Sequence, residues 1–79
     1  MFNYSELRGK IRAKYHLQSS FAAAMGMSTT TLSARLNNHS DWSQAEISAA
    51  IKLLGIPETD IPLYFFTRPA QELEQNASA

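Results

Sequence analysis

The chain has 79 residues, 44% of them hydrophobic and 18% charged, with a formal net charge of zero. This composition is that of one small folded domain and excludes a disordered polyampholyte, while the absence of cysteine excludes disulfides, thiolate zinc sites and thiol catalysis. The longest apolar stretches fall well short of the ~20 residues that cross a bilayer, and no secretory signal is visible, so we expect a soluble intracellular protein with no membrane contact.

The net charge hides an asymmetry along the chain. Residues 1–40 carry five basic residues against one acidic residue, whereas residues 41–79 carry two against six. Such halves are typical of a protein in which one surface meets an anion, but solvated faces of small proteins also differ by a few charges.

The first half of the chain predicts three short helices. An apolar stripe predicts a first helix that begins at Asn3 or Ser5, and a corner at 16–17 separates it from a second helix over about 18–25. Gly26 stands where a helix ends in a left-handed residue, and Ser28 is the expected N-cap of a third helix over about 29–37. The stripe of the first helix consists of Tyr4, Leu7, Ile11 and Tyr15.

The second half predicts one well-marked helix and a less certain end. Ser43 and Glu46 have the spacing of a capping box, Trp42 and Ile47 that of a hydrophobic staple, and Gly55 is the expected stop. Residues 56–62 are predicted as a turn with room for one short helical turn. Residues 63–67 fit either a final helical turn or an extended segment, and residues 69–79 are predicted as a flexible tail.

The segment 18–38 carries the functional signal. Two short helices are joined by a glycine turn, with Ala22 small enough for a close crossing and Leu32 placed to lock the second helix onto the first. This is the pattern of a helix-turn-helix, in which the second helix enters the DNA major groove. An ordinary helical corner would show much of the same pattern.

Together with its flanks, this segment resembles the lambda-type repressor and Cro helix-turn-helix proteins, and more narrowly small phage Cro/repressor-like proteins. The resemblance covers residues 2–68 and rests on the segments 3–11, 21–38, 42–47 and 61–67. It implies an all-α fold, a compact bundle of about five short helices, with residues 1–68 as the DNA-binding domain. It also implies a transcription regulator of a phage or prophage that acts in the bacterial cytoplasm, nucleoid-associated when bound to operator DNA.

The resemblance implies two groups of DNA-binding residues. Side chains facing base edges would be Thr29, Thr30, Ser33, Ala34 and Asn37. Side chains binding backbone phosphates would be Arg8, Arg12, Gln18, Ser28 and Asn38, with His39 as a further candidate. Three departures stand out: Leu17 replaces the usual Ser or Thr cap, the net charge is zero, and the recognition face has no outward Arg or Lys to read guanine. Non-specific DNA affinity is therefore expected to be weak.

The sequence leaves a second function open. A near-neutral domain with an acidic second half also fits a protein-interaction module that modulates a partner repressor and has little DNA affinity of its own. Adjacent aromatic residues cannot all point inward from one short segment, so a homodimer or repressor interface is expected at Leu63, Tyr64, Phe65 and Phe66. No cofactor, metal site, small-molecule substrate or enzymatic activity is expected, because the chain has no nucleophile–base pair, phosphate loop or paired histidine ligands.

Overall fold

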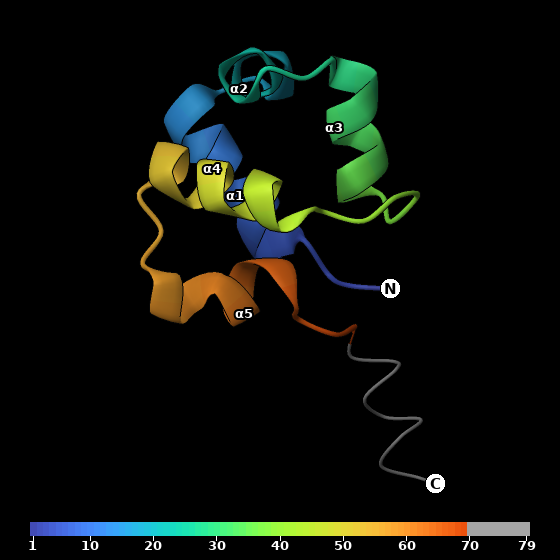
Figure 1. Cartoon of the computed structure of the whole chain (residues 1–79), viewed down its shortest axis with the longest axis vertical. Helices are drawn as coiled ribbons and strands as arrows, with labels where there is room; N and C mark the ends of the chain where they lie inside the picture. Colours follow the sequence, from blue (N-terminus) through green and yellow to red (C-terminus); the bar gives the residue numbers. More distant parts are fainter. Residues whose placement is uncertain (70–79) are drawn as a thin grey trace, which may run out of the picture.

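The computed structural model describes residues 1–69, which fold into five α-helices and one 3₁₀ helix with no strand (Figure 1). The predicted all-α fold is therefore confirmed. In chain order the elements are α1 (Ser5–Tyr15), α2 (Gln18–Met25), α3 (Thr29–Leu36), α4 (Gln44–Leu54), η1 (Glu58–Asp60) and α5 (Ile61–Phe65).

The ends of α1 depend on side-chain and backbone turns. The Asn3 side-chain oxygen accepts hydrogen bonds from the Ser5 backbone N–H at 2.9 Å and from the Ser5 hydroxyl at 2.6 Å, which satisfies a donor that the helix itself leaves free. At the other end His16 has a φ of +67°, and the Leu17 N–H donates to the Tyr15 carbonyl at 2.7 Å. This three-residue turn is a strained conformation for a residue with a side chain, and it turns the chain directly into α2.

Gly26 reverses the chain between α2 and α3. Its φ of +71° lies in the left-handed region that glycine adopts without a Cβ clash, and its N–H donates to the Ala23 carbonyl at 3.1 Å. Ser28 then caps α3, because its hydroxyl oxygen accepts from the Thr31 N–H at 3.1 Å. Both sequence predictions for this turn are confirmed.

The second half resolves what the sequence left open. α4 begins with the predicted capping box and ends at Gly55, whose φ is +69°. The single turn expected after Pro57 is η1, and the ambiguous aromatic segment is helical, since α5 runs from residue 61 with Pro62 in its first turn. Proline is tolerated there because the first helical N–H groups have no intrahelical partner. The predicted tail lies outside the described residues except for 69.

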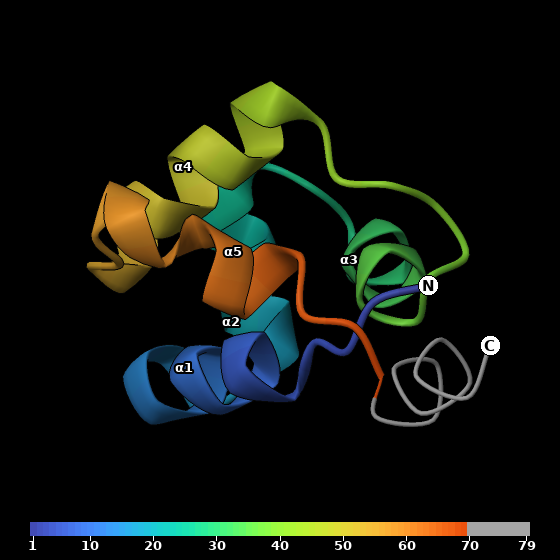
Figure 2. The same cartoon turned by 90° about the horizontal axis from the view of Figure 1, so that it is seen from below.

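One hydrophobic core joins all five helices. α1 packs against α2, α4 and α5, whereas the main helix contact of α3 is with α2 (Figures 1 and 2). α3 consequently lies at the edge of the molecule. No helix of residues 1–69 has the length and apolarity needed to cross a bilayer. The buried residues are Tyr4, Leu7, Ile11, Phe21, Ala22, Leu32, Leu36, Ala50, Ile51, Leu54, Ile56 and Phe65.

An aromatic cluster joins the N-terminal arm to α5. Trp42 packs edge-on against Phe65 at 5.2 Å between ring centroids and against Tyr4 at 6.5 Å, and Phe2 meets Phe66 edge-on at 5.5 Å. The Asn3 N–H also donates to the Thr67 carbonyl at 2.7 Å. Since Trp42 is packed among these rings and lies with Ile47 against the core, its role as a hydrophobic staple is supported.

Candidate functional site

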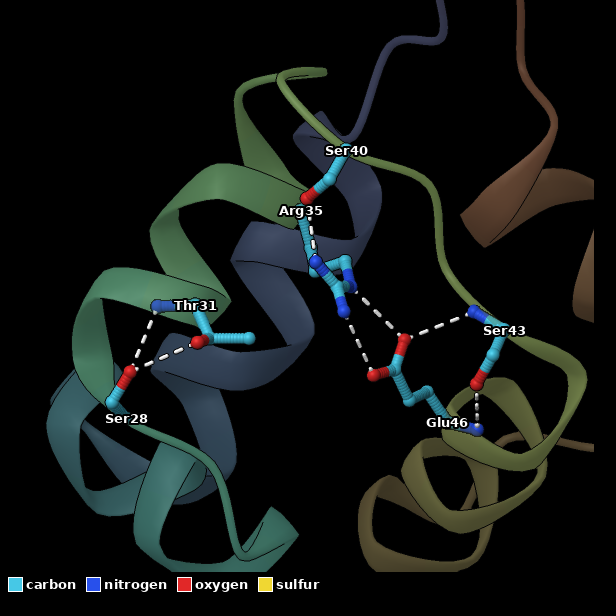
Figure 3. A network of polar contacts seen from close by, with 6 residues as sticks. All are labelled: Ser28, Thr31, Arg35, Ser40, Ser43 and Glu46. Carbon is cyan, nitrogen blue, oxygen red and sulfur yellow. Dashed lines mark hydrogen bonds and ion pairs between the residues drawn. The ribbon is translucent and has the colours of Figure 1, made fainter.

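The predicted recognition helix presents a polar face to solvent. Thr29 and Thr30 are exposed, and with the half-buried Ser33 and Ala34 and the exposed His39 they line a shallow hollow on α3. The structure therefore brings most of the predicted base-facing residues together on one side of this helix. Ser28, at its start, also donates its hydroxyl hydrogen to the Thr31 hydroxyl oxygen at 3.0 Å (Figure 3).

The remaining predicted DNA contacts near the end of α3 bond within the protein. The Asn37 amide donates to the Ser33 hydroxyl at 3.1 Å, and its carbonyl oxygen accepts from the Arg8 guanidinium at 2.8 Å. Asn38 accepts from the Phe2 N–H at 2.9 Å and donates to the Phe2 carbonyl at 2.8 Å. Asn38 thus holds the N-terminal arm, a structural contact that its predicted phosphate role did not include.

The cation nearest the α3 face is engaged in an ion pair. Arg35 donates to both carboxylate oxygens of Glu46, at 3.0 and 3.1 Å, and also to the Ser40 hydroxyl (Figure 3). Glu46 at the same time accepts from the Ser43 N–H at 2.9 Å as part of the α4 capping box. The hydrogen bond from Arg35 holds the pKa of Glu46 below its ordinary value, and the same bond raises the pKa of Arg35. A DNA phosphate would have to compete with this carboxylate for the guanidinium.

A second predicted group gathers at the corner of α1 and α2. Arg8, Arg12 and Gln18 line a small hollow of about 130 Å³ with His16 and Leu17. The Arg8 guanidinium also donates to the Leu36 carbonyl at 3.0 Å. Some of its N–H groups are therefore already bonded to the end of α3. No side chain caps the start of α2, which is consistent with Leu17 at the position where a Ser or Thr cap was expected. Three phosphate candidates thus lie at the α1–α2 corner, whereas Ser28 and His39 lie with the base-facing candidates on α3, and Arg8 connects the two groups through Asn37.

The helices α4 and α5 present an apolar surface that the sequence located only in part. The exposed fractions of the Leu63 and Phe66 side chains are 48% and 49%, whereas Phe65 is buried and Tyr64 is half-buried. The expectation that the three aromatic rings point in different directions is confirmed. Of the predicted interface residues, Phe65 belongs to the core, since its exposed fraction is 1%.

Two cavities indent this surface, and we call them together the α4–α5 groove. One, of about 280 Å³, lies over the aromatic cluster and is lined by Phe2, Tyr4, Asp41, Trp42, Ile47, Phe65 and Phe66. The other, of about 310 Å³, lies between α4 and the η1–α5 segment and is lined by Gln44, Ile47, Ser48, Ile51, Glu58, Ile61 and Phe66. Ile47 and Phe66 line both cavities, so the apolar surface is continuous. Burial and the Asp41 charge both raise the pKa of Tyr4 at its edge.

The described residues hold no cluster of three or more His, Cys, Asp or Glu side chains that could bind a metal ion. The candidate surfaces are the polar face of α3, the α1–α2 corner that carries Arg8, Arg12 and Gln18, and the α4–α5 groove.

Comparison with known proteins decides the family. A family model described as a protein of unknown function (DUF739) matches residues 1–68. The chain belongs to the DUF739 family. The match does not show the predicted membership of the Cro/repressor helix-turn-helix family, whereas the structural relative described next supports the coarser expectation of a phage regulatory protein. No curated protein matches the chain.

This DUF739 chain is similar to a solved phage protein, the modulator of repression (MOR) of the temperate bacteriophage TP901-1 from Lactococcus lactis. The two sequences are 45% identical, the match covers 82% of this chain and 88% of the other, and the TM-score is 0.74. The all-helical fold and the phage context are common to both.

Sequence patterns did not predict the polar network around Arg35 or either cavity of the groove. The capping-box pattern identified Glu46, but its second partner lies eleven residues earlier on another helix, and periodicity carries no signal for that pairing. The cavity over the aromatic cluster is lined by Phe2, from the N-terminal arm, beside Phe66, and only the tertiary fold brings these two residues together.

Proposed function

We propose that this chain modulates a phage repressor by direct protein–protein contact. The observation that carries the proposal is the 45% identity to the TP901-1 modulator of repression over 82% of the chain. The partner would be the repressor encoded with this chain in the same phage or prophage. The protein would act in the cytoplasm of the bacterial host, without catalysis and without a cofactor.

The α4–α5 groove supports this function. Soluble monomers rarely expose contiguous apolar patches unless these mark a ligand or protein interface. Here the half-exposed Phe66 lines two connected cavities, and Leu63 of α5 is a further half-exposed apolar residue three positions earlier in the chain. A repressor also needs a basic surface to hold DNA, so acidic residues around the groove, such as Asp41 and Glu58, complement a basic partner.

Direct operator binding is the second candidate, supported by the helix-turn-helix geometry of α2 and α3. In that function Thr29, Thr30 and Ser33 would face base edges in the major groove, while Arg12 and Gln18 would bind phosphates. Two observations weigh against it as the main activity. The chain has no net charge, and the two arginines nearest α3 bond to Glu46 and Asn37 within the protein. Both reduce the counterion release that drives DNA affinity.

The test uses the purified chain, the repressor encoded by the same phage or prophage, and the operator DNA that this repressor binds. Calorimetry of the chain with the repressor measures the protein contact, and gel shifts with the chain alone, the repressor alone and both measure the effect on DNA. We expect binding to the repressor, a changed shift when both are present, and no operator-specific shift by the chain alone. Operator-specific binding by the chain alone, with no repressor binding, would establish the second candidate instead.

A further inference from the structure

The two cavities of the α4–α5 groove share an unusual composition. Each has apolar walls and one carboxylate at its edge, Asp41 in the first and Glu58 in the second. Neither cavity is lined by Lys, Arg or His. Both carboxylates are exposed, and within residues 1–69 neither is ion-paired. The groove therefore repeats one chemical pattern, an apolar cavity beside an unpaired negative charge.

Glu46, the carboxylate that follows Asp41 along the chain, differs from these two. It is half-buried and is fully engaged by Arg35 and Ser43. The fold thus neutralises that carboxylate internally and leaves the two at the groove available. A free carboxylate at the edge of an apolar cavity favours a ligand that brings a cation next to an apolar group.

We propose that the groove binds one segment of the repressor that carries two apolar side chains, each accompanied by a Lys or Arg. One apolar side chain fills the cavity over Trp42 while its basic neighbour reaches Asp41. The other fills the cavity between α4 and η1–α5 while its basic neighbour reaches Glu58. The segment crosses the ridge formed by Ile47 and Phe66, which separates the cavities. This proposal rests on the proposed function and names the chemistry of its partner.

A second copy of this chain fits the groove less well. Among residues 1–69 the large exposed apolar side chains are Met1, Leu17, Leu63 and Phe66, and of these Phe66 belongs to the groove itself. Leu17 lies beside Arg12 at the α1–α2 corner, so this corner provides one apolar side chain with a basic neighbour, whereas the two cavities of the groove would hold two such pairs. Docking of that corner on the groove would be a head-to-tail contact, which continues into open chains unless the rotation closes a ring.

The test measures the Kd of the full chain for its repressor by calorimetry at low and at physiological salt. Phe66→Ala truncates one of the two side chains that line both cavities, and we expect it to weaken binding by about 10-fold or more, as for a central interface aromatic. Asp41→Asn and Glu58→Gln each remove one charge, and we expect about 3- to 10-fold weaker binding at low salt with a smaller effect at high salt.

Matched controls lie outside the groove. Leu17→Ala removes an exposed apolar side chain at the α1–α2 corner, and Glu6→Gln removes an exposed carboxylate from the first turn of α1. Both should bind the repressor like the unaltered chain. Circular dichroism and thermal melting check that every variant is folded, which the exposure of Phe66, Asp41 and Glu58 leads us to expect.

The outcomes separate this proposal from the proposed function. If the repressor does not bind the unaltered chain, the proposed function fails. If it binds, and the groove variants bind as tightly as the controls, the proposed function stands and the groove proposal is overturned. A dimer of this chain in sedimentation that Phe66→Ala dissociates, with repressor binding unaffected, would also overturn it in favour of a second copy.

Discussion

Replacing Glu46 tests the polar network that links α3 to α4. The Glu46 side chain makes two kinds of bond, a paired contact with the Arg35 guanidinium and the reciprocal cap to the Ser43 N–H. The ion-paired side chains are only 21% and 22% exposed, and the contact uses both carboxylate oxygens. We therefore expect the ion pair between Arg35 and Glu46 to stabilise the fold by about 1 kcal/mol, at the upper end of the range for surface ion pairs.

The cap adds to this figure. Loss of a helix cap costs about 0.5–1 kcal/mol at the lower end of the observed range. Because Glu46→Ala removes both the ion pair and this cap, it should lower the free energy of unfolding by about 1.5–2 kcal/mol. For a domain of this size that corresponds to a fall in Tm of roughly 6–16 °C. Glu46→Gln keeps an oxygen that can accept from the Ser43 N–H and loses only the charge, so it should cost about 1 kcal/mol.

The assay is chemical denaturation followed by circular dichroism, with a double-mutant cycle that pairs Glu46→Gln with Arg35→Met. A coupling free energy of about 1 kcal/mol between the two sites is expected. Glu6→Gln, at an exposed position on α1, is the control and should change stability by less than about 0.5 kcal/mol. If Glu46→Ala and Glu46→Gln both unfold like the unaltered chain, the network contributes nothing and the reasoning is refuted.

Three further predictions follow from local features. Arg35 lowers the folded-state pKa of Glu46 below its ordinary value of 4.5. The difference in stability between the unaltered chain and Glu46→Gln should therefore be complete above about pH 5 and should disappear as the pH falls through the folded-state pKa. A difference in stability that persisted unchanged at about pH 2 would contradict this. Gly26→Ala should destabilise the fold by about 1–2 kcal/mol, because Gly26 has a φ of +71°. Gly9→Ala lies within α1 with open space around the added Cβ and should stabilise the fold by about 0.5–1 kcal/mol. Thermal melts in which the two variants do not shift the Tm in opposite directions would refute these roles of the two glycines. Thr30→Ala should leave the affinity for the repressor unchanged, because Thr30 lies on α3 and outside the groove. A loss of about 1–3 kcal/mol of operator discrimination in competition gel shifts would show that α3 reads bases and would contradict this prediction.

Local signals in the sequence predicted most helix boundaries. Ser28 and Ser43 capped the helices they preceded, and Gly26 and Gly55 ended theirs in the left-handed conformation, because each of these effects acts within a few residues. The same reasoning left residues 63–67 undecided. Five residues are too few for periodicity to separate a helical turn from an extended segment, and α5 owes its conformation to Phe65 packing into the core.

The candidate site was less predictable than the fold. The polar face of α3 followed from helical spacing, but the bonds that tie Arg8 to Asn37 and Arg35 to Glu46 join separate helices. The first of these bonds engages Arg8, one of the two arginines to which the DNA-binding interpretation assigned a phosphate. The sequence did indicate an interface in the last aromatic segment, yet one of the two cavities there is completed by Phe2 and Trp42 from distant parts of the chain.

The most direct test of the account is a titration of the ¹⁵N-labelled chain with its unlabelled repressor, followed by NMR amide shifts residue by residue. The account predicts that the largest shifts map to the α4–α5 groove, around Ile47, Glu58 and Phe66, while the amides of Thr29 and Thr30 change little. A spectrum that the repressor leaves unchanged, together with shifts along α3 when operator DNA alone is added, would contradict it.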